Sequence, residues 1–346
     1  MESWTGVSSS NEALKVSRKW LVTGAAGFIG SHLVEELLRR GQQVRAFDNF
    51  STGSHANLED VAERVGDEPW QRFELCEGDL RSPEDCALAA DGAQRVLHQA
   101  ALGSVPRSVE DPATTHATNV DGTLNLLVAA RDAGCERFVY ASSSSVYGDD
   151  PELPKVEAAI GRPLSPYAAG KRMAELYADV FQRNYGLPCV GLRYFNVFGP
   201  RQDPEGAYAA VIPRWTSALV EGREVVVYGD GETSRDFCPV ANVVQANLLA
   251  ALAPAAAEAR VYNVGLGGRT TLTELFSLIR DGLVRCGVDV GGVEPRHEEF
   301  RPGDVRHSLA SIEAIRGDLG YEPSVDLVDG MRRTLEWFLA ARSASV

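Results

Sequence analysis

Short apolar runs alternate with amphipathic patterns through the first two thirds of the 346-residue chain. Strands are expected at 19–23, 44–48, 72–76, 95–99, 137–142 and 188–194, and helices from about 28 and at about 119–133 and 168–185. In the first helix, Leu33, Val34, Leu37 and Leu38 form one apolar stripe, and Gly41 follows as a C-terminal cap. Strands and helices that alternate in this way are typical of βαβ units. The pattern therefore predicts an α/β fold with a doubly wound parallel sheet of the Rossmann type.

The pattern changes after Gly199 to loops and short strands, which indicates a smaller C-terminal substrate lobe. We expect a flexible tail at 1–17, a nucleotide-binding domain at 18–198 with a later return segment near 238–266, and a lobe formed mainly by 199–346. The alanine-rich stretch LLAALAPAAAEA (248–259) predicts a surface helix interrupted by Pro254.

Composition narrows the range of partners. A formal net charge of -14 and a pI near 5.0 argue against nucleic acid and acidic membranes and favour a small molecule. The chain shows neither a signal-peptide pattern nor an apolar stretch of membrane-spanning length. Its six cysteines have no metal-binding spacing, which fits buried thiols in a reducing cytosol, so we expect a cytoplasmic protein without a metal.

The segment TGAAGFIG, from Thr23 to Gly30, indicates a dinucleotide site directly after the first strand. Its glycines permit a tight turn and close approach of a pyrophosphate, and the following helix offers free N–H groups to that anion. Asp48 closes the second strand, where a carboxylate would accept hydrogen bonds from a ribose and repel a 2′-phosphate, so NAD is favoured over NADP. The loop residues expected at this cofactor are Gly24, Gly27, Phe28, Ile29 and Gly30.

Asp79 and Leu80 follow the third strand, where they would meet the adenine. Asp79 could equally cap the helix that begins at Ser82 and Pro83.

Tyr167 and Lys171 stand four residues apart on a predicted helix, and Ser143 precedes them at the end of a strand. Residues four apart share a helix face, so the ammonium of Lys171 would favour the phenolate of Tyr167. A free tyrosine has a pKa of about 10, and holding it at about 7 takes roughly 4 kcal/mol. One ammonium together with an oxidised nicotinamide would supply this stabilisation. The three residues thus predict a tyrosine base in a catalytic set.

These motifs, together with DNFSTG, NVDGT, SSSSVYG, LRYFNVFGPRQ, SRDF and RPGDVRHS, resemble the extended short-chain dehydrogenase/reductases, and within them the UDP-hexose 4-epimerases, from about Lys19 to Phe338. The resemblance implies a resident NAD, a UDP-sugar substrate, and a homodimer built through the helices at 119–133 and 168–185. It implies further cofactor contacts from Asn49, Ser51, Gly53, Gln99, Ala100, Ala101, Asn119 and Tyr194. It also implies substrate contacts from Gly103, Ser104, Ser144, Asn196, Gln202, Arg235, Arg301, Asp304 and Ser308.

Some of these residues also have a structural interpretation. Arg235 and Arg301 could be surface ion-pair partners, although two arginines in an acidic lobe suit a diphosphate better. We expect Arg193 to be structural and His98 to be a packed core residue.

At two positions this sequence differs from related enzymes, and both differences bear on the predicted reaction and substrate. Nucleotide-sugar dehydratases of this kind carry an acid just after the catalytic hydroxyl, whereas this chain has Ser144 and Ser145, which favours C4 epimerisation. In epimerases restricted to UDP-glucose and UDP-galactose, a tyrosine occupies the position of Ser308. The smaller residue would leave room for an acetamido group, and predicts conversion of UDP-GlcNAc to UDP-GalNAc. Ser308 could also be an ordinary polar loop residue.

Other functions remain open at this point. A UDP-glucose or UDP-glucuronate 4-epimerase would use the same catalytic set. A redox-sensing NAD-binding protein would need none of Ser143, Tyr167 and Lys171, so their presence argues against it.

Overall fold

A computed structural model describes residues 14–204, 209–253, 260–300 and 305–344. Its centre is a parallel seven-stranded sheet in the order β11-β6-β5-β4-β1-β2-β3. The strands are β1 (Lys19–Thr23), β2 (Gln43–Asp48), β3 (Phe73–Glu77), β4 (Arg95–His98), β5 (Arg137–Ser143), β6 (Cys189–Tyr194) and β11 (Arg260–Val264). The sheet confirms the predicted fold class, and six of its strands lie within one residue of the predicted ranges.

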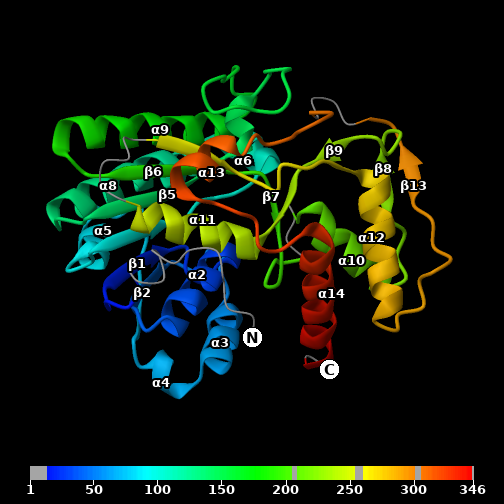
Figure 1. The fold of residues 1–346 in the computed structure, drawn as a ribbon, viewed down its shortest axis with the longest axis horizontal. Coiled ribbons are helices and arrows are strands. Elements are labelled where there is room, and N and C mark those ends of the chain that lie inside the picture. Colours follow the sequence, from blue (N-terminus) through cyan, green and yellow to red (C-terminus); the bar gives the residue numbers. More distant parts are fainter. Residues whose placement is uncertain (1–13, 205–208, 254–259, 301–304, 345–346) are drawn as a thin grey trace.

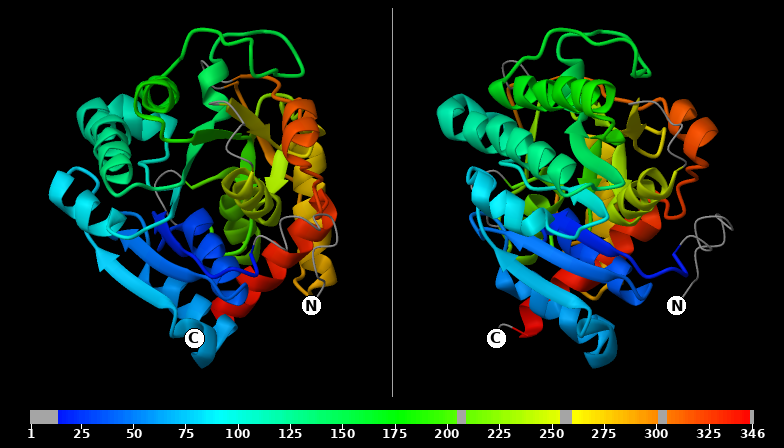
Figure 2. Two further views of the ribbon diagram at one scale, coloured as in Figure 1. Left: turned by 60° about the vertical axis from the view of Figure 1, so that its left-hand side comes forward. Right: turned by 90° about the vertical axis from the view of Figure 1, so that its left-hand side faces the viewer.

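Helices cover both faces of this sheet (Figures 1 and 2). One face carries α5 (Pro83–Ala90), α8 (Gly122–Asp132) and α9 (Pro166–Tyr185), and the other carries α2 (Phe28–Arg39), α3 (His55–Val65) and α11 (Val240–Leu252). The shorter segments of this part of the chain are α4 (Asp67–Trp70), α6 (Val105–Glu110), α7 (Pro112–His116), η1 (Ala117–Asp121) and η2 (Ser144–Tyr147). Each face has its own buried apolar core, so the sheet is the middle of three layers.

The strand order reverses between β1 and β4, because β2 and β3 extend to one side of β1 while β4, β5 and β6 extend to the other. The chain leaves the carboxyl ends of β1 and β4 in opposite directions, which opens a crevice there. The glycine-rich loop follows β1 and the segment from Gln99 to Ala101 follows β4. The fold therefore brings these two loops together at the point where α/β sheets bind ligands.

The described part of the alanine-rich stretch, residues 248–253, belongs to the end of a buried helix, α11, so the prediction of a surface helix was wrong for these residues. Nearly every residue of α11 is buried, because the helix packs against α2 and against β4, β5 and β6. Its alanines allow a close approach to the sheet, and its apolar residues surround the helix on all sides. The helix ends at Leu252, and Pro254 lies outside the described residues.

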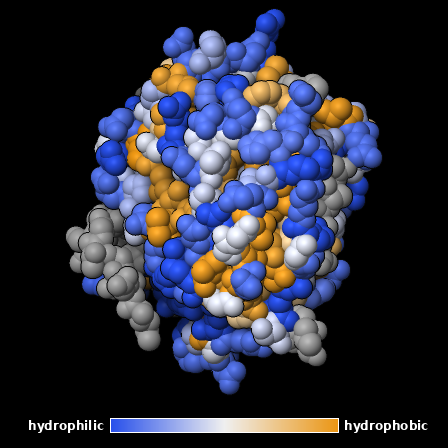
Figure 3. All heavy atoms as spheres, turned by 90° about the vertical axis from the view of Figure 1, so that its right-hand side faces the viewer, coloured by the Kyte–Doolittle hydropathy of each residue, from blue (hydrophilic) through white to orange (hydrophobic). Residues whose placement is uncertain are grey.

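A smaller lobe begins with β7 (Asn196–Phe198), just before Gly199, and has a separate core that includes Trp215, Phe237, Phe276 and Leu335. Its helices are α10 (Val211–Val220), α12 (Leu272–Arg285) and α14 (Leu327–Ala344), and its strand pairs are β7 with β10 (Phe237–Pro239), β8 (Val226–Tyr228) with β13 (Arg296–Glu298), and β9 (Ser234–Arg235) with β12 (Thr270–Thr271). On the face that carries α12 and α14, apolar side chains gather in patches between hydrophilic ones (Figure 3).

The C-terminal part of the chain also returns to the central sheet. The strand β11 pairs with β6, and α13 (Glu313–Leu319) packs against β11. The strand β11 is thus the edge strand of the sheet, and α13 lies beside this part of the molecule, as Figure 1 shows.

At the start of the described chain, Leu14 is already buried and its carbonyl accepts a hydrogen bond from Gln42 (2.9 Å). Residues 14–17 of the expected tail are therefore part of the described structure and begin with a packed residue, while residues 1–13 lie outside the described residues. Four cysteines are buried, but Cys76 is only half-buried and Cys286 is exposed, so the expectation of buried thiols was wrong for these two. Of the helices in the described part of the chain, none is long and apolar enough to cross a membrane.

Candidate active site

A cavity of about 590 Å³ opens at the carboxyl ends of the central strands. It is lined by the loops after β1, β2, β3, β4 and β5, by the first turns of α9, and by the segment that follows β6. The predicted residues that line it are Gly24, Gly27, Phe28, Ile29, Gly30, Asp48, Asn49, Ser51, Gly53, Asp79, Leu80, Gln99, Ala100, Ala101, Gly103, Ser104, Ser143, Ser144, Tyr167, Lys171, Tyr194, Asn196 and Gln202. The cavity thus brings together most of the predicted cofactor residues and the three predicted catalytic ones.

The glycine-rich loop is packed too closely to hold side chains. A Cβ at Gly24, whose φ is +65°, would lie 2.7 Å from the backbone nitrogen of Ala100, and one at Gly30 would lie 2.0 Å from the carbonyl oxygen of Gly24. The helix α2 begins at Phe28 with no side-chain cap and no acidic residue in its first turn. Its first N–H groups are therefore left for an anion such as a pyrophosphate, and the loop fits NAD.

Asp48 links the loops after β1 and β2. One of its carboxylate oxygens accepts a hydrogen bond from the backbone N–H of Ala26 (2.9 Å), and the other accepts one from Phe50 (2.9 Å). A carboxylate has about four acceptor sites, so two remain for ribose hydroxyls. The side chain is buried at the cavity wall and is fixed in position before any ligand contacts it.

Asp79 does not cap the following helix, so that alternative is excluded. Ser82 is the N-cap of α5 and accepts from the N–H of Asp85. The carboxylate of Asp79 instead binds Arg81 and accepts a hydrogen bond from Asn49 (2.9 Å), and the hydrogen bonds from Arg81 hold its pKa well below the usual range.

The catalytic set forms one cluster at the start of α9. Tyr167 lies in the first helical turn, which Ser165 caps, and its hydroxyl is hydrogen-bonded to Ser143 at the end of β5. The ammonium of Lys171 lies 5.9 Å from the centre of the Tyr167 ring and donates to the carbonyl of Ala141 (2.8 Å).

The protein groups around Tyr167 do not by themselves produce the expected phenolate. Burial raises the pKa of Tyr167, and the hydrogen bond with Ser143 opposes this only in part. Burial also lowers the pKa of Lys171 to about 8, so its ammonium still predominates at neutral pH. The lowering expected from the sequence therefore needs a further positive charge beside the ring, such as that of an oxidised nicotinamide.

Three other predicted residues do not line the cavity. Asn119, in the π-helical segment η1, holds the backbone of Leu102 through two hydrogen bonds (2.8 and 3.1 Å), so it shapes the cavity wall from behind. Arg235 and Ser308 lie together in the small lobe, where the N–H of Ser308 donates to the carbonyl of Ser234 (3.0 Å). Arg301 and Asp304 lie outside the described residues.

Some residues of the site were not predicted from the sequence, whereas the structural role predicted for His98 is confirmed. Thr52, Leu102, Thr118 and Ser142 line the cavity, and each stands next to or near a predicted residue, which was the available signal. His98 is a core residue as predicted, since its ring lies between the hydroxyls of two buried threonines (2.7 and 3.0 Å) and burial lowers its pKa to about 3.

Comparison with known proteins decides the family. Residues 20–265 match the model of the NAD dependent epimerase/dehydratase family. The chain belongs to this family. The family's dependence on NAD agrees with the cofactor predicted from the glycine-rich loop.

Relatives in this family differ in their reactions. A UDP-glucose 4-epimerase from Mycolicibacterium smegmatis is 39% identical over 92% of this chain and 97% of its own length. A dTDP-glucose 4,6-dehydratase from Streptomyces niveus is 37% identical over 92% of both chains. The solved structure of a UDP-N-acetylglucosamine 4-epimerase from Methanobrevibacter ruminantium M1, in complex with UDP-N-acetylmuramic acid, is 38% identical with a TM-score of 0.85, and covers 94% of this chain and 99% of that one.

The packing of the glycine-rich loop predicts that Gly30→Ala will lose its cofactor. The added Cβ has no room beside the carbonyl of Gly24, so the loop must shift at a cost of about 1–3 kcal/mol. We expect the NAD content of the purified protein to fall at least about tenfold, with a lower melting temperature. Gly317→Ala is the matched control, because a Cβ there meets nothing within 4 Å. A full complement of NAD in the Gly30→Ala protein would contradict this account of the loop.

Proposed function

We propose that this protein catalyses the NAD-dependent C4 epimerisation of a UDP-hexose, with UDP-GlcNAc and UDP-GalNAc as the preferred pair. The observation that carries the proposal is the meeting of Ser143, Tyr167 and Lys171 in one cavity with the glycine-rich loop. A protein that only senses the redox state of NAD would not need these three groups. Their convergence therefore favours an enzyme.

Each member of the set has a distinct task in this proposal. Tyr167, as phenolate, withdraws the proton of the sugar 4-hydroxyl, directly or through Ser143. Lys171 supplies positive charge beside the Tyr167 ring and holds the ribose of the nicotinamide. The chemistry that bound NAD would supply is the transfer of a hydride from and back to C4. Return to the opposite face of the sugar requires firm contacts to UDP and loose contacts to the hexose.

The charges in the cavity favour epimerisation over the dehydration catalysed by some relatives. Of the described residues that line the cavity, the acids are Asp48 and Asp79. Asp48 accepts hydrogen bonds from Ala26 and Phe50, and Asp79 is bound to Arg81, so both carboxylates are held by the loops after β1, β2 and β3. Ser144 and Ser145, which follow the catalytic hydroxyl, cannot exchange a proton readily near neutral pH. An elimination beside the keto group would lack its acid.

The preference for acetylated sugars rests on Ser308 and on the similarity to a UDP-N-acetylglucosamine 4-epimerase. Ser308 adjoins β9, which carries Arg235, the residue assigned to the diphosphate. UDP-glucose and UDP-glucuronate remain alternative substrates, because other relatives are named for them. Incubation of the purified protein with each UDP-sugar, followed by sugar analysis, tests the assignment, and UDP-GalNAc is the expected product from UDP-GlcNAc.

The assigned base predicts the behaviour of Tyr167→Phe. This variant should retain the fold and bound NAD but lose turnover by several orders of magnitude, since it removes the phenol hydrogen-bonded to Ser143. The measurements are the melting temperature, the NAD content and kcat. Near-normal kcat in a folded protein would refute the assignment of the base.

The assigned gate predicts that Ser308→Tyr will stop work on UDP-GlcNAc and spare UDP-glucose. A filled pocket rejects the larger substrate by steric exclusion, whereas the open pocket of the wild type loses only about 1–3 kcal/mol of contact with the smaller one. Ser308→Ala serves as the control and should keep both activities. If the tyrosine variant converted UDP-GlcNAc at the wild-type rate, Ser308 would not be the gate.

We also propose that the protein is a homodimer. The helix α9 presents apolar side chains to solvent, with Met173, Leu176 and Val180 each exposed by 39% or more. The helix α8, which was also expected in the interface, instead buries Leu127 in the core and packs Leu124 against that core. The interface would therefore centre on α9.

This surface predicts that the double variant Leu176→Arg with Val180→Arg will be monomeric. Two charges in the centre of an apolar interface would have to lose their water on association. Light scattering at micromolar concentration should give the dimer mass for the wild type and the monomer mass for the variant. Leu88→Arg, on the exposed face of α5, should remain a dimer. A monomeric wild type would exclude the proposal.

A further inference from the structure

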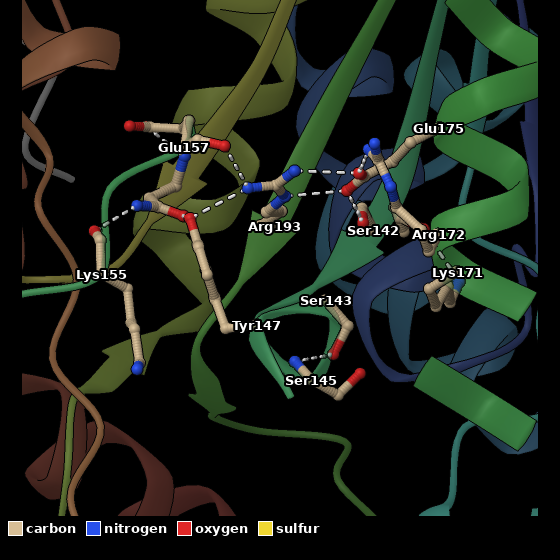
Figure 4. A network of polar contacts seen from close by, with 12 residues as sticks. Ser142, Ser143, Ser145, Tyr147, Lys155, Glu157, Lys171, Arg172, Glu175 and Arg193 are labelled. Atoms are coloured by element: carbon tan, nitrogen blue, oxygen red, sulfur yellow. Dashed lines mark hydrogen bonds and ion pairs between the residues drawn. The ribbon is translucent and has the colours of Figure 1, made fainter. Parts of the chain in front are cut away.

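In a network of polar contacts near Ser143 and Lys171, Arg193 lies between Glu175 on one side and Tyr147 on the other (Figure 4). One carboxylate oxygen of Glu175 accepts from the hydroxyl of Ser142 (2.6 Å) and from Nε of Arg193 (2.8 Å). The other accepts from a second nitrogen of Arg193 (2.9 Å) and from Arg172 (2.8 Å). The side chains of Glu175 and Arg193 are only 1% and 2% exposed. The pair of Glu175 and Arg193 is thus buried and held in a specific geometry, whereas Arg172 reaches the surface.

Glu175 lies on the helix that carries the catalytic tyrosine. Tyr167, Lys171 and Glu175 are spaced by four residues and so share one side of α9. Lys171 donates to the carbonyl of Ala141, and Glu175 binds the hydroxyl of Ser142. Two successive residues of β5, immediately before Ser143, are therefore bound to α9. These contacts fix the position of α9 in the direction of β5.

The network also controls the segment that follows Ser143. Arg193 and Ser142 are register partners on neighbouring strands, so their side chains emerge on the same face. Arg193 donates to the hydroxyl of Tyr147 (3.1 Å), which lies in the short helix η2 that begins just after Ser143. Tyr147 in turn donates to Asn263 of β11 (2.6 Å). Ser143 is thus held between two anchored neighbours, Ser142 and Tyr147.

We propose that Glu175 is a positioning residue which, through Arg193 and Ser142, holds the hydroxyls of Ser143 and Tyr167 at the separation that proton transfer requires. Neither Glu175 nor Arg193 lines the cavity, so neither contacts substrate or NAD directly. The inference rests on the proposed function, because it assigns Ser143 and Tyr167 to the proton transfer.

Two single variants test the positioning role. Ser142→Ala removes one hydrogen bond and little volume, and Glu175→Gln keeps the shape of the side chain but leaves the charge of Arg193 unpaired. A displacement of about 1 Å at reacting groups can cost about 100-fold in rate. We expect kcat to fall about 10-fold in Ser142→Ala and about 100-fold in Glu175→Gln. In Glu175→Gln, KM and the NAD content should stay near the wild-type values, because Glu175 does not line the cavity.

A double variant separates positioning from stability. Glu175→Met with Arg193→Met replaces the ion pair by apolar groups of similar volume, an exchange that is often neutral for folding. We expect a melting temperature near that of the wild type but a kcat still reduced at least about 10-fold. Recovery of wild-type kcat in this protein would show that the pair serves folding alone, and would overturn the proposal.

Asn242→Ala is the matched control for the loss of buried polar contacts. Asn242 on α11 is fully buried, makes hydrogen bonds to Ser324 and Val325, and lies outside the cavity lining. Its melting temperature should fall while kcat is retained. An equal fall of kcat in Asn242→Ala and Glu175→Gln would also overturn the positioning role.

The failure of this inference can be distinguished from failure of the proposed function. If the wild type epimerises no UDP-hexose, the proposed function is wrong. In that case the surroundings of Tyr167 are tested through its pKa. The pKa is measured from the absorbance difference between each protein and the same protein with Tyr167→Phe. A Tyr167 pKa that is the same with and without the Glu175→Gln change would count against the positioning role.

Discussion

The attachment of α9 to β5 is the constraint on which the catalytic arrangement depends. A buried carboxylate and a buried guanidinium, Glu175 and Arg193, bind each other with two hydrogen bonds, and the remaining contacts of the carboxylate go to Ser142 and Arg172. Removing one member of such a pair costs about 3–5 kcal/mol, because an uncompensated charge stays in the protein interior. Any shift of the helix along the strand would break this set of bonds together with the Lys171 contact. The position of α9 relative to β5, and with it the position of Tyr167, is therefore fixed by these contacts.

The parallel sheet was predictable because its strands are short apolar runs with helices between them, and few other folds are compatible with this pattern. The helix α11 was misread for a physical reason. Alanine occurs on exposed as well as on buried helix faces, so its presence did not indicate burial. Its small side chain allows α11 to lie close to the sheet on one side and to α2 on the other. Whether α11 is buried on all sides depends on the order of the strands in the sheet and on the connections between them. One of these strands, β11, joins the sheet only after the chain has begun the small lobe. Local periodicity carries no information on such distant pairing.

The site was predicted unevenly for a related reason. Residues that follow a strand end, such as Gly24, Asp48 and Gln99, reach the cavity because the carboxyl ends of parallel strands share one edge. Arg235 and Ser308 lie in a lobe of two-residue and three-residue strands, where nothing in the sequence fixes the distance to that edge. Glu175 had a usable signal, since it stands four residues after Lys171. A carboxylate on the apolar side of a helix needs a buried cation, and Arg193 at the partner position of Ser142 supplies it.

Burial gives the catalytic tyrosine its dependence on a cofactor. In the protein alone, burial raises the pKa of Tyr167, although Ser143 is bonded to its hydroxyl and the Lys171 ammonium lies 5.9 Å from the ring centre. Holding the phenolate at neutral pH takes roughly 4 kcal/mol beyond a free tyrosine, and a desolvated ring needs more. In a dry site a positive charge acts far more strongly than in water, so an oxidised nicotinamide beside the ring would make much of the difference. The same burial that disfavours the phenolate without NAD would strengthen its interaction with NAD, which ties the formation of the base to the presence of the oxidised cofactor.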